Sequence, residues 1–398
     1  MNIQSAIQQQ FNTLQYAELF QHIHLFHDFE KTPQDLEWHS EGNVLIHNDM
    51  VLDEMYKIIN HEAKNLSDDE KTILVLAALF HDICKPITTK EKEIQGKIRI
   101  VSPYHEEKAR NYLFFKLSSL IPKHLIMPII ELVGYHQLPK LLVVKDKSKK
   151  DYLSLSRKAP MHLFYYLELA DMRGRHCTDK QEQLDYLEMF KLYSIDYNIW
   201  QQQPYQEEKL FIQNEFKDNL IADFVFHSFC KNIENGSIFS VEEEISKSFH
   251  YKNNSHCVLL CGLSGSGKST FIKNNFPQYN IVSLDNIREE LTGKRSDHSQ
   301  EGRVKDLAKQ KLKLHLGKKE PVVWDATNYR KDFRNIPLGL ANDYNSFSEV
   351  FVLHTTLQQC LKNNKDRQHS VPEDVIYKQM DNFELPEINE ALKVNFII

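Results

Sequence analysis

The sequence has few of the residues that mark secreted, disulfide-bonded or membrane-spanning proteins. Its 398 residues contain only six cysteines and no C-x-x-C pair, so it predicts neither a structural zinc site nor a disulfide framework. The longest clear apolar run, Ile73 to Phe80, has eight residues, far fewer than the roughly 18 of a membrane helix. The start, MNIQSAIQQQF, lacks the basic and apolar segments of a signal peptide. We therefore expect a cytoplasmic protein that has no membrane association.

Glycine is also scarce in the first 250 residues, and this part of the chain shows the spacing of helices. Val44, His47, Val51 and Met55 recur three and four residues apart after Asn43, a suitable N-cap. The segment Met161 to Asp171, rich in Leu, Tyr and Phe, has the same character. We predict an all-α helical domain over residues 1–250.

The pattern changes near His256, where short apolar runs begin to alternate with helical segments. The runs are Cys257–Cys261, Asn280–Leu284, Pro321–Trp324 and Glu349–His354. Such alternation predicts a parallel sheet flanked by helices. We expect an α/β domain over residues 256–398, joined to the first domain by a polar linker around Lys247 to Ser255.

Charge gives a weaker signal than the motifs. The net charge is −6, and from His256 onward 20 Lys and Arg face 18 Asp and Glu, so no general affinity for nucleic acid is indicated. Two stretches are locally basic, with seven basic against two acidic residues in Lys140 to Lys158 and 13 against eight in Arg288 to Arg334. Such stretches are usually solvated surface, but both adjoin the motifs below, where a polyanion would need countercharge.

A phosphate-binding motif follows the first apolar run of the C-terminal domain. GLSGSGKST matches G-x-x-x-x-G-K-[ST], in which backbone N–H groups surround phosphate oxygens at a helix N-terminus. Lys268 reaches the β- and γ-phosphates of ATP, and Ser269 ligates Mg²⁺. The predicted nucleotide-binding residues are Gly262, Ser264, Gly265, Ser266, Gly267, Lys268, Ser269 and Thr270, with Arg367 added below.

Further residues in this domain favour phosphoryl transfer to a hydroxyl group. Asp285, in SLDNIREEL, is placed to accept a proton from an acceptor alcohol, the alternative being an N-cap for a helix beginning at Asn286. Arg288, one turn later, is a candidate clamp for an acceptor phosphate, or else a surface arginine. Arg367, before the helix opened by Pro372, is placed to neutralise charge on the transferred phosphoryl group. No NKxD signature of guanine recognition is present.

Together with WDATN, which carries Asp325, these segments resemble the 5′-OH polynucleotide kinase family over roughly Cys257 to Met380. The resemblance implies that Lys268 and Ser269 bind ATP and magnesium and that Asp285 is the general base. It also implies that Arg288 holds the acceptor's phosphate and Arg367 contacts the donor phosphates. Asp325 is assigned to the acceptor side, where it orients Arg288 or a metal-bound water.

The N-terminal domain carries an ordered set of histidines and aspartates. LAALFHDICKP places His81 and Asp82 at the end of an apolar helix. Burying such polar groups without partners costs on the order of 2–7 kcal/mol, a cost that metal ligation offsets. Each histidine alone has an ordinary structural explanation, but the whole order favours a metal site. The set is His47, His81, Asp82, His105, His136 and Asp171.

This order resembles the HD phosphohydrolase superfamily in its dinuclear form. The resemblance implies that His47, His81, Asp82 and Asp171 bind a first metal, that Asp82 bridges, and that His105 and His136 complete the second site. Imidazole-rich ligation favours Mn, Fe, Co, Ni, Cu or Zn over Mg. Lys85 is placed to bind a phosphate oxygen or to protonate the leaving group, unless it is a solvated helix end. Arg173 and Arg175 are further candidates for phosphate binding.

The two halves together resemble the bacterial HD-Pnk family of bifunctional RNA end-healing enzymes. The resemblance implies hydrolysis of 2′,3′-cyclic and 3′-phosphates by one domain, and ATP-dependent phosphorylation of 5′-OH ends by the other. RNA or DNA ends are the expected partners, and a separate ligase is expected because no ligase lysine motif is visible. A homo-oligomer is compatible with the sequence. Two alternatives stay open: a nucleotidase fused to a nucleoside kinase, and a nucleotide-sensing regulatory protein.

Overall fold

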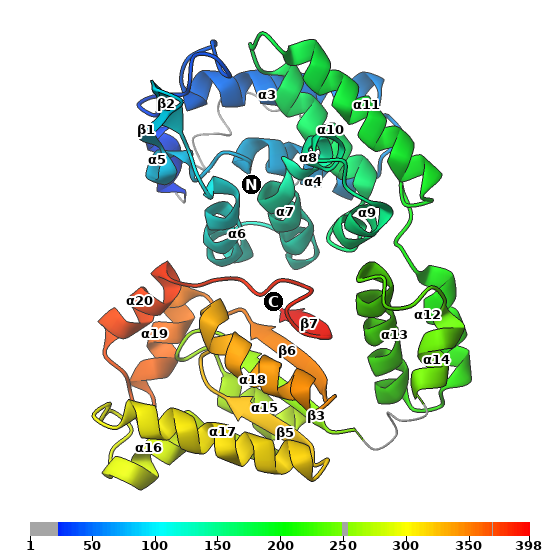
Figure 1. The fold of residues 1–398 in the computed structure, drawn as a ribbon. Helices are drawn as coiled ribbons and strands as arrows, with labels where there is room; N and C mark the ends of the chain where they lie inside the picture. The colour runs from blue at the N-terminus through cyan, green and yellow to red at the C-terminus, as the bar shows by residue number, and fades with distance from the viewer. Residues whose placement is uncertain (1–22, 249–253, 368) are drawn as a thin grey trace. The chain divides into compact units, whose positions relative to one another are not determined.

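The computed structural model describes residues 23–248, 254–367 and 369–398, which form two compact units (Figure 1). The first unit is Met1–Pro204 and the second is Tyr205–Ile398. Among the described residues, none of the helices combines the length and hydropathy that a bilayer-spanning segment requires. The predicted fold class, a helical domain followed by an α/β domain with a parallel sheet, is confirmed.

From residue 23 onward, where the structure describes it, the first unit consists of helices apart from one hairpin (Figure 1). A 3₁₀ helix, η1 (His24–Asp28), precedes α3, and a second, η2 (Leu117–Ser119), follows α6. The α-helices are α3 (Val44–His61), α4 (Asp68–Phe80), α5 (Lys85–Thr88), α6 (His105–Lys116), α7 (Lys123–Tyr135), α8 (Leu138–Val144), α9 (Lys149–Ser156), α10 (Met161–Arg173) and α11 (Lys180–Asp196).

Local sequence explains where the helices that carry the HD motif begin and end. Asn43 caps α3 as predicted, since its side chain accepts a hydrogen bond from the backbone N–H of Ile46. Ser67 and Glu70 form a capping box at the start of α4. Every residue of α4 from Thr72 to Phe80 is buried, so this helix runs through the core and delivers its C-terminus to the interior.

The hairpin was not predicted, and its exposure explains why. β1 (Lys90–Ile94) and β2 (Lys97–Val101) pair antiparallel across a two-residue turn at Gln95 and Gly96, which both have positive φ. β1 alternates Lys with Glu, and in β2 the apolar residues Ile98 and Ile100 alternate with charged ones, but neither strand buries a residue fully. Strands with so little burial give a weak sequence signal. The first unit is therefore mostly, rather than wholly, helical.

The second unit begins with three helices, α12 (Gln206–Glu215), α13 (Asn219–Glu234) and α14 (Val241–Ser248). They enclose a small apolar cluster around Ile212, Val225 and Phe229, and Phe224 of α13 stacks on Phe347 of the sheet. These helices therefore group with the second unit, whereas the predicted limits, 1–250 and 256–398, placed them in the first domain. Their functional assignment stays a prediction, and residues 249–253 of the predicted linker lie outside the described residues.

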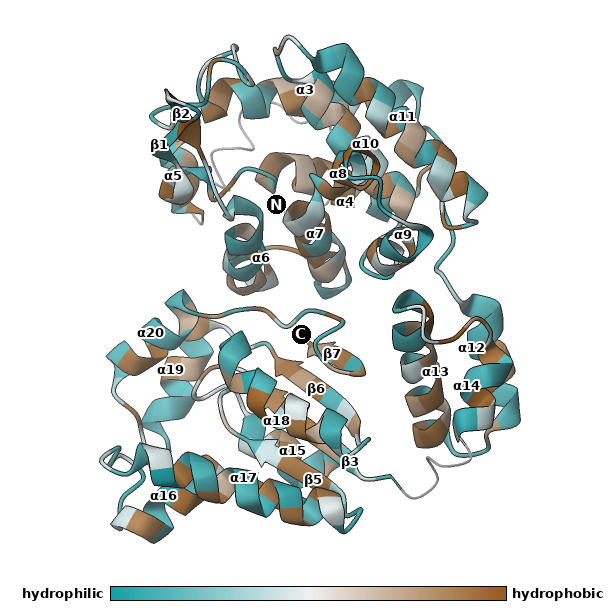
Figure 2. Cartoon of the chain, in the orientation of Figure 1, coloured by the Kyte–Doolittle hydropathy of each residue, from teal (hydrophilic) through white to brown (hydrophobic). Residues whose placement is uncertain are grey.

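A five-stranded parallel sheet forms the centre of the rest of this unit, in the order β4-β5-β3-β6-β7. All six residues of β3 are buried, as expected for a central parallel strand, and Figure 2 shows β5 and β6 in hydrophobic colours. The four predicted strands are present, and β7 was missed. The strands are β3 (His256–Cys261), β4 (Asn280–Ser283), β5 (Val322–Asp325), β6 (Phe347–Leu353) and β7 (Lys393–Ile397).

Helices connect these strands: α15 (Lys268–Asn275), α16 (Leu284–Thr292), α17 (Glu301–Gly317), α18 (Lys331–Asp343), α19 (Leu357–Lys365) and α20 (Glu373–Asp381). The core beneath them includes Val258 and Leu260 of β3, Ile272 of α15 and Val323 of β5. Because the strands are parallel, the loops after β3, β4 and β5 meet at one edge of the sheet, where ligands bind in open α/β sheets.

Candidate metal centre and nucleotide site

The predicted metal ligands of the first unit are all buried, and helix ends deliver most of them. His47 lies in the first turn of α3, His81 and Asp82 follow the last turn of α4, and His105 is the first residue of α6. His136 follows α7, and Asp171 lies in α10. None of the six side chains is more than 5% exposed, so water alone does not satisfy them.

These six residues form two groups whose ligand atoms lie within 4.8 Å of one another, His47 with His81 and Asp171, and Asp82 with His105 and His136. In the first group, Nε2 of His47 lies 3.3 Å from Nε2 of His81 and 3.0 Å from Oδ1 of Asp171. Oδ2 of Asp82 lies 3.2 Å from Nε2 of His81, and Oδ1 of Asp82 lies 3.3 Å from Nε2 of His105. Asp82 therefore stands between the two groups.

The donor set fits two transition metal ions. Two atoms about 2.0–2.1 Å from one ion lie roughly 3–3.4 Å apart, which matches the separations in the first group. Nε2 of His105 is buried without a hydrogen bond of acceptable geometry among the described residues. A polar atom in that state is costly unless a bound ion or water satisfies it. Ligation by these residues therefore remains our proposal.

The two buried carboxylates are held in the charged form by their neighbours. Burial opposes ionisation of Asp82, but His81 and Lys85 beside it keep the pKa of its carboxyl well below the usual range. Burial likewise opposes ionisation of Asp171, and Arg175 keeps its pKa low. Both groups are thus ready to ligate cations without first losing a proton.

The imidazoles of His81 and His136 differ in the direction in which their pKa is shifted. Burial disfavours the charged ring of His81, yet the neighbouring carboxylate of Asp82 raises its pKa above the ordinary value. Burial lowers the pKa of His136 to about 3, and the nearby His81 acts in the same direction. A cation that binds here must therefore displace a proton from His81 when the pH is below its pKa, whereas the neutral ring of His136 has no such proton to lose.

Two of the three predicted phosphate-binding side chains lie at this centre. Nζ of Lys85 is buried, 2.7 Å from Oδ2 of Asp82, and donates a hydrogen bond to Gln34, so the solvated alternative is wrong. Nη2 of Arg175 donates to both carboxylate oxygens of Asp171, at 2.8 and 2.7 Å. Arg173 instead pairs with Glu62 and does not join the cluster.

In the second unit, the P-loop connects β3 to α15 as predicted. Lys268 donates to the carbonyl oxygens of Gly262 and Leu263, at 3.0 and 2.7 Å, and burial lowers its pKa. Gly265 has φ +82°, and a Cβ there would lie 2.3 Å from the carbonyl oxygen of Cys360, so glycine is required. Thr327 accepts from the N–H of Gly262, which ties the DATN segment to the loop.

The loop opens into a cavity of about 1490 Å³ that brings the other predicted kinase residues together. Ser269, Asp285, Arg288, Asp325 and Arg367 all line it. Ser283 is the N-cap of α16, so Asp285 lies in the first turn and the alternative that Asp285 caps this helix is wrong.

The two carboxylates of this cavity, Asp285 and Asp325, differ in their exposure and in their charged neighbours. Asp285 is exposed and accepts a hydrogen bond from Arg288, whereas Asp325 lies deeper. Burial raises the pKa of Asp325, which Lys268 counters. Asp325 therefore lies on the phosphate side, next to Lys268, and no contact between Asp325 and Arg288 is present among the described interactions.

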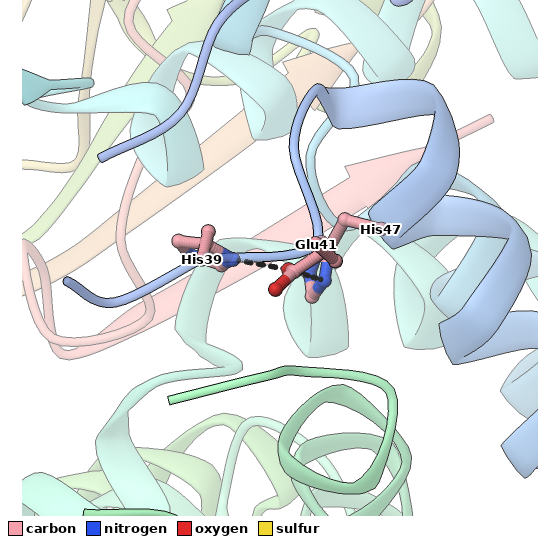
Figure 3. A group of neighbouring side chains, drawn as sticks. All are labelled: His39, Glu41 and His47. Carbon is pink, nitrogen blue, oxygen red and sulfur yellow. Dashed lines mark hydrogen bonds and ion pairs between the residues drawn. The ribbon is translucent and has the colours of Figure 1, made fainter. Parts of the chain in front are cut away.

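Two glutamates of these sites were not identified from the sequence. Glu41 contacts His39 and His47 beside the metal centre (Figure 3). Glu301 of α17 accepts hydrogen bonds from Nε and Nη2 of Arg288, at 3.1 and 3.3 Å. Neither glutamate belongs to a motif, because each approaches its partner only through the fold.

Comparison with known families matches one segment in each unit to a domain model. Residues 50–157 match the HD domain, and residues 257–386 match an AAA domain. The first match includes His81, Asp82, His105 and His136, and the second includes the P-loop and the cavity residues. These matches indicate an enzyme with phosphohydrolase and kinase activity.

Among solved structures, similarity extends over about a third of the chain. A chain of the Pnkp1/Rnl/Hen1 RNA repair complex is 21% identical, with a TM-score of 0.30, over 32% of this chain and 44% of that one. A gluconokinase from Sinorhizobium meliloti 1021 is 19% identical (TM-score 0.27, 36% of this chain, 81% of that one). Chaetomium thermophilum Kti12, in complex with ADP-AlF3, is 17% identical (TM-score 0.29, 35% and 88%). The chain thus spans less than half of the repair-complex chain, and likeness of this extent does not identify a substrate.

Proposed function

We propose that this chain, an HD phosphohydrolase domain joined to a P-loop kinase domain, heals broken nucleic-acid ends, RNA in particular, before ligation. Breakage of RNA leaves a 2′,3′-cyclic phosphate and a 5′-OH, whereas a ligase needs a 3′-OH and a 5′-phosphate. One observation carries the proposal. The same chain holds a buried two-group His/Asp cluster and a P-loop cavity with a carboxylate, Asp285, at its acceptor end. Each end of a break thus has a matching chemistry.

In the HD domain the reaction is two successive hydrolyses. Water oxygen bonds to phosphorus and the bond to O2′ breaks, then a second water releases inorganic phosphate from O3′. The six ligands would hold two divalent ions, which would supply an activated water and stabilise the leaving oxygen. Lys85 and Arg175 bind phosphate oxygens, and Lys85 is placed to return a proton to the leaving oxygen.

In the kinase domain Asp285 takes the proton of the 5′-OH. The oxygen of that hydroxyl bonds to the γ-phosphorus of ATP while the bond between the γ-phosphorus and ADP breaks. Lys268 and Arg367 neutralise the phosphoryl charge, and Ser269 holds Mg²⁺. The position of Asp285 supports this role, because its side chain lines the cavity and is exposed. Sealing of the healed ends requires a separate ligase.

A specific observation favours an alternative, a nucleotidase fused to a nucleoside kinase. The guanidinium of Arg288 already donates to Asp285 and Glu301, so it is not free to hold an acceptor phosphate unless those bonds rearrange. A nucleoside would not require such a rearrangement.

The deciding experiment uses the full chain, ATP and an oligonucleotide with a 5′-OH and a 2′,3′-cyclic phosphate, with both ends analysed afterwards. We expect a 5′-phosphate and a 3′-OH. Free nucleosides serve as the parallel acceptor. Efficient phosphorylation of nucleosides with an unchanged oligonucleotide would contradict end healing and support the alternative.

A further inference from the structure

The four histidines of the metal centre turn the same ring nitrogen away from the ligand cluster. Nδ1 of His81 lies 2.7 Å from the carbonyl oxygen of Ala78, and Nδ1 of His136 lies 2.8 Å from that of Val133. Nδ1 of His105 lies 2.8 Å from the carbonyl oxygen of Ser102. A proton on Nδ1 leaves the Nε2 lone pair for a cation, so these backbone carbonyls select the ligating tautomer.

His47 has no such carbonyl available, and its place in the helix explains why. Ala78 and Val133 lie in the last turns of α4 and α7, where carbonyls lack helical partners. His47 lies in the first turn of α3, and the carbonyl three residues before it belongs to Val44, inside the helix. Helical carbonyls there already accept from the N–H four residues on.

Glu41 takes the place of the missing carbonyl. Its Oε1 lies 2.9 Å from Nδ1 of His47 (Figure 3). The other ring nitrogen, Nε2, makes the contacts with Asp171 and His81. We propose that Glu41 is a positioning residue of the metal centre, which fixes the ring and the tautomer of His47 so that Nε2 faces the ion. Glu41 itself contacts neither the ion nor the substrate.

Glu41 is itself held in place, as this role requires. Its side chain is 1% exposed, and its Oε1 also lies 2.8 Å from Nδ1 of His39. Its Oε2 accepts a hydrogen bond from the backbone N–H of His176, at 3.0 Å. These contacts hold the carboxylate of Glu41 in one orientation.

The same three side chains, His39, Glu41 and His47, also lie close enough to surround an ion of their own. Their contacts speak against that reading. One carboxylate oxygen is hydrogen-bonded to Nδ1 of His39 at 2.8 Å and lies 2.9 Å from Nδ1 of His47 in an ion-pair contact, and the other oxygen accepts from a backbone N–H. Both oxygens are therefore engaged by donors, and two ions per chain are expected rather than three.

The test measures binding of Zn²⁺ to the metal-free full chain by competition with a chelator, for the wild type, Glu41→Ala and Glu41→Gln. We expect Glu41→Ala to weaken Zn²⁺ binding by about 10–100-fold, in the range found for outer-shell partners. Glu41→Gln keeps an acceptor oxygen and should lose less. The matched control is Glu37→Gln, which removes a half-exposed carboxylate of the same segment and should leave Zn²⁺ binding unchanged.

Kinase activity and thermal unfolding of each variant report whether the chain is folded, and Glu41→Gln carries the test if the alanine variant does not fold. Equal Zn²⁺ affinity in wild type and Glu41→Ala would overturn the positioning role. Three ions in wild type and two in Glu41→Ala would make Glu41 a ligand instead. The inference rests on the metal-binding part of the proposed function. A wild type that binds no Zn²⁺, Mn²⁺ or Co²⁺ would refute that part, whatever Glu41 does.

Discussion

Arg288 donates a hydrogen bond from Nη1 to Oδ1 of Asp285 at 2.6 Å, within α16. The two residues stand one helical turn apart, so the helix itself sets their geometry. This contact couples the proposed base to the proposed acceptor clamp, and Glu301 holds the arginine from the other side.

Asp285→Asn keeps the size of the side chain and removes its ability to accept a proton. We expect the rate of phosphoryl transfer to fall by about 10²–10⁴ with little change in ATP affinity. Single-turnover kinetics and nucleotide binding measure the two quantities. Glu290→Gln, on the exposed face of the same helix, is the control and should behave as wild type. Wild-type turnover in Asp285→Asn would remove this residue from the chemistry.

If Arg288 holds the acceptor phosphate, as proposed, Arg288→Ala should mainly raise the KM for an oligonucleotide acceptor, because the variant loses the guanidinium. An oligonucleotide should be a much better acceptor than a nucleoside, and added salt should weaken acceptor binding more than ATP binding. The control is Arg303→Ala, an exposed arginine of α17. If only kcat falls and the KM is unchanged, Arg288 acts by holding Asp285 rather than the acceptor.

The two halves should need different metals. A chelator should remove phosphohydrolase activity, and a transition ion should restore it better than Mg²⁺, because four of the six ligands are imidazoles. The kinase should work with Mg²⁺, a hard cation that Ser269 and phosphate oxygens bind. Assays of both activities after chelation and readdition of single metals make the comparison. Full recovery of the phosphohydrolase with Mg²⁺ alone would contradict the ligand assignment.

Binding of metal to the first unit should weaken as the pH falls. The pKa of His81 is raised, so below that pKa its ring is protonated and the proton competes with the ion. The pKa of His136 is lowered to about 3, so this residue contributes no competing proton near neutral pH. Calorimetry of Zn²⁺ binding in buffers of different ionisation enthalpy counts the protons released. Release should disappear as the pH rises above the pKa of His81, and release that is independent of pH would contradict this assignment.

The ligand set was predictable from the sequence because each member lies at a helix end or on a buried helical face, where a polar residue is conspicuous. His81 and Asp82 close an apolar helix, and Asp171 interrupts another. Glu41 was not predictable, since it precedes its helix in an irregular segment and meets His47 only through a turn of the chain. No periodicity marks such a residue.

The same limit applies to side chains of one type. Arg173 and Arg175 are equivalent in the sequence, but the end of α10 directs the first to Glu62 and the second to Asp171. Strands were predictable where both faces are buried, as in β3, and were missed where charged residues cover them, as in β1. Buried elements thus leave a pattern that can be recognised in the sequence, whereas contacts between exposed or irregular segments can be identified only from the structure.

The most direct test of the central claim, two independent sites serving the two ends of one break, follows both ends of a single oligonucleotide in separation-of-function variants. Lys268→Ala should abolish 5′ phosphorylation and leave 3′ processing at the wild-type rate, because Lys268 belongs to the P-loop of the second unit and donates to its carbonyl oxygens. Asp82→Ala should do the reverse, because Asp82 stands between the two ligand groups of the first unit. Loss of both activities in either folded variant would contradict the account.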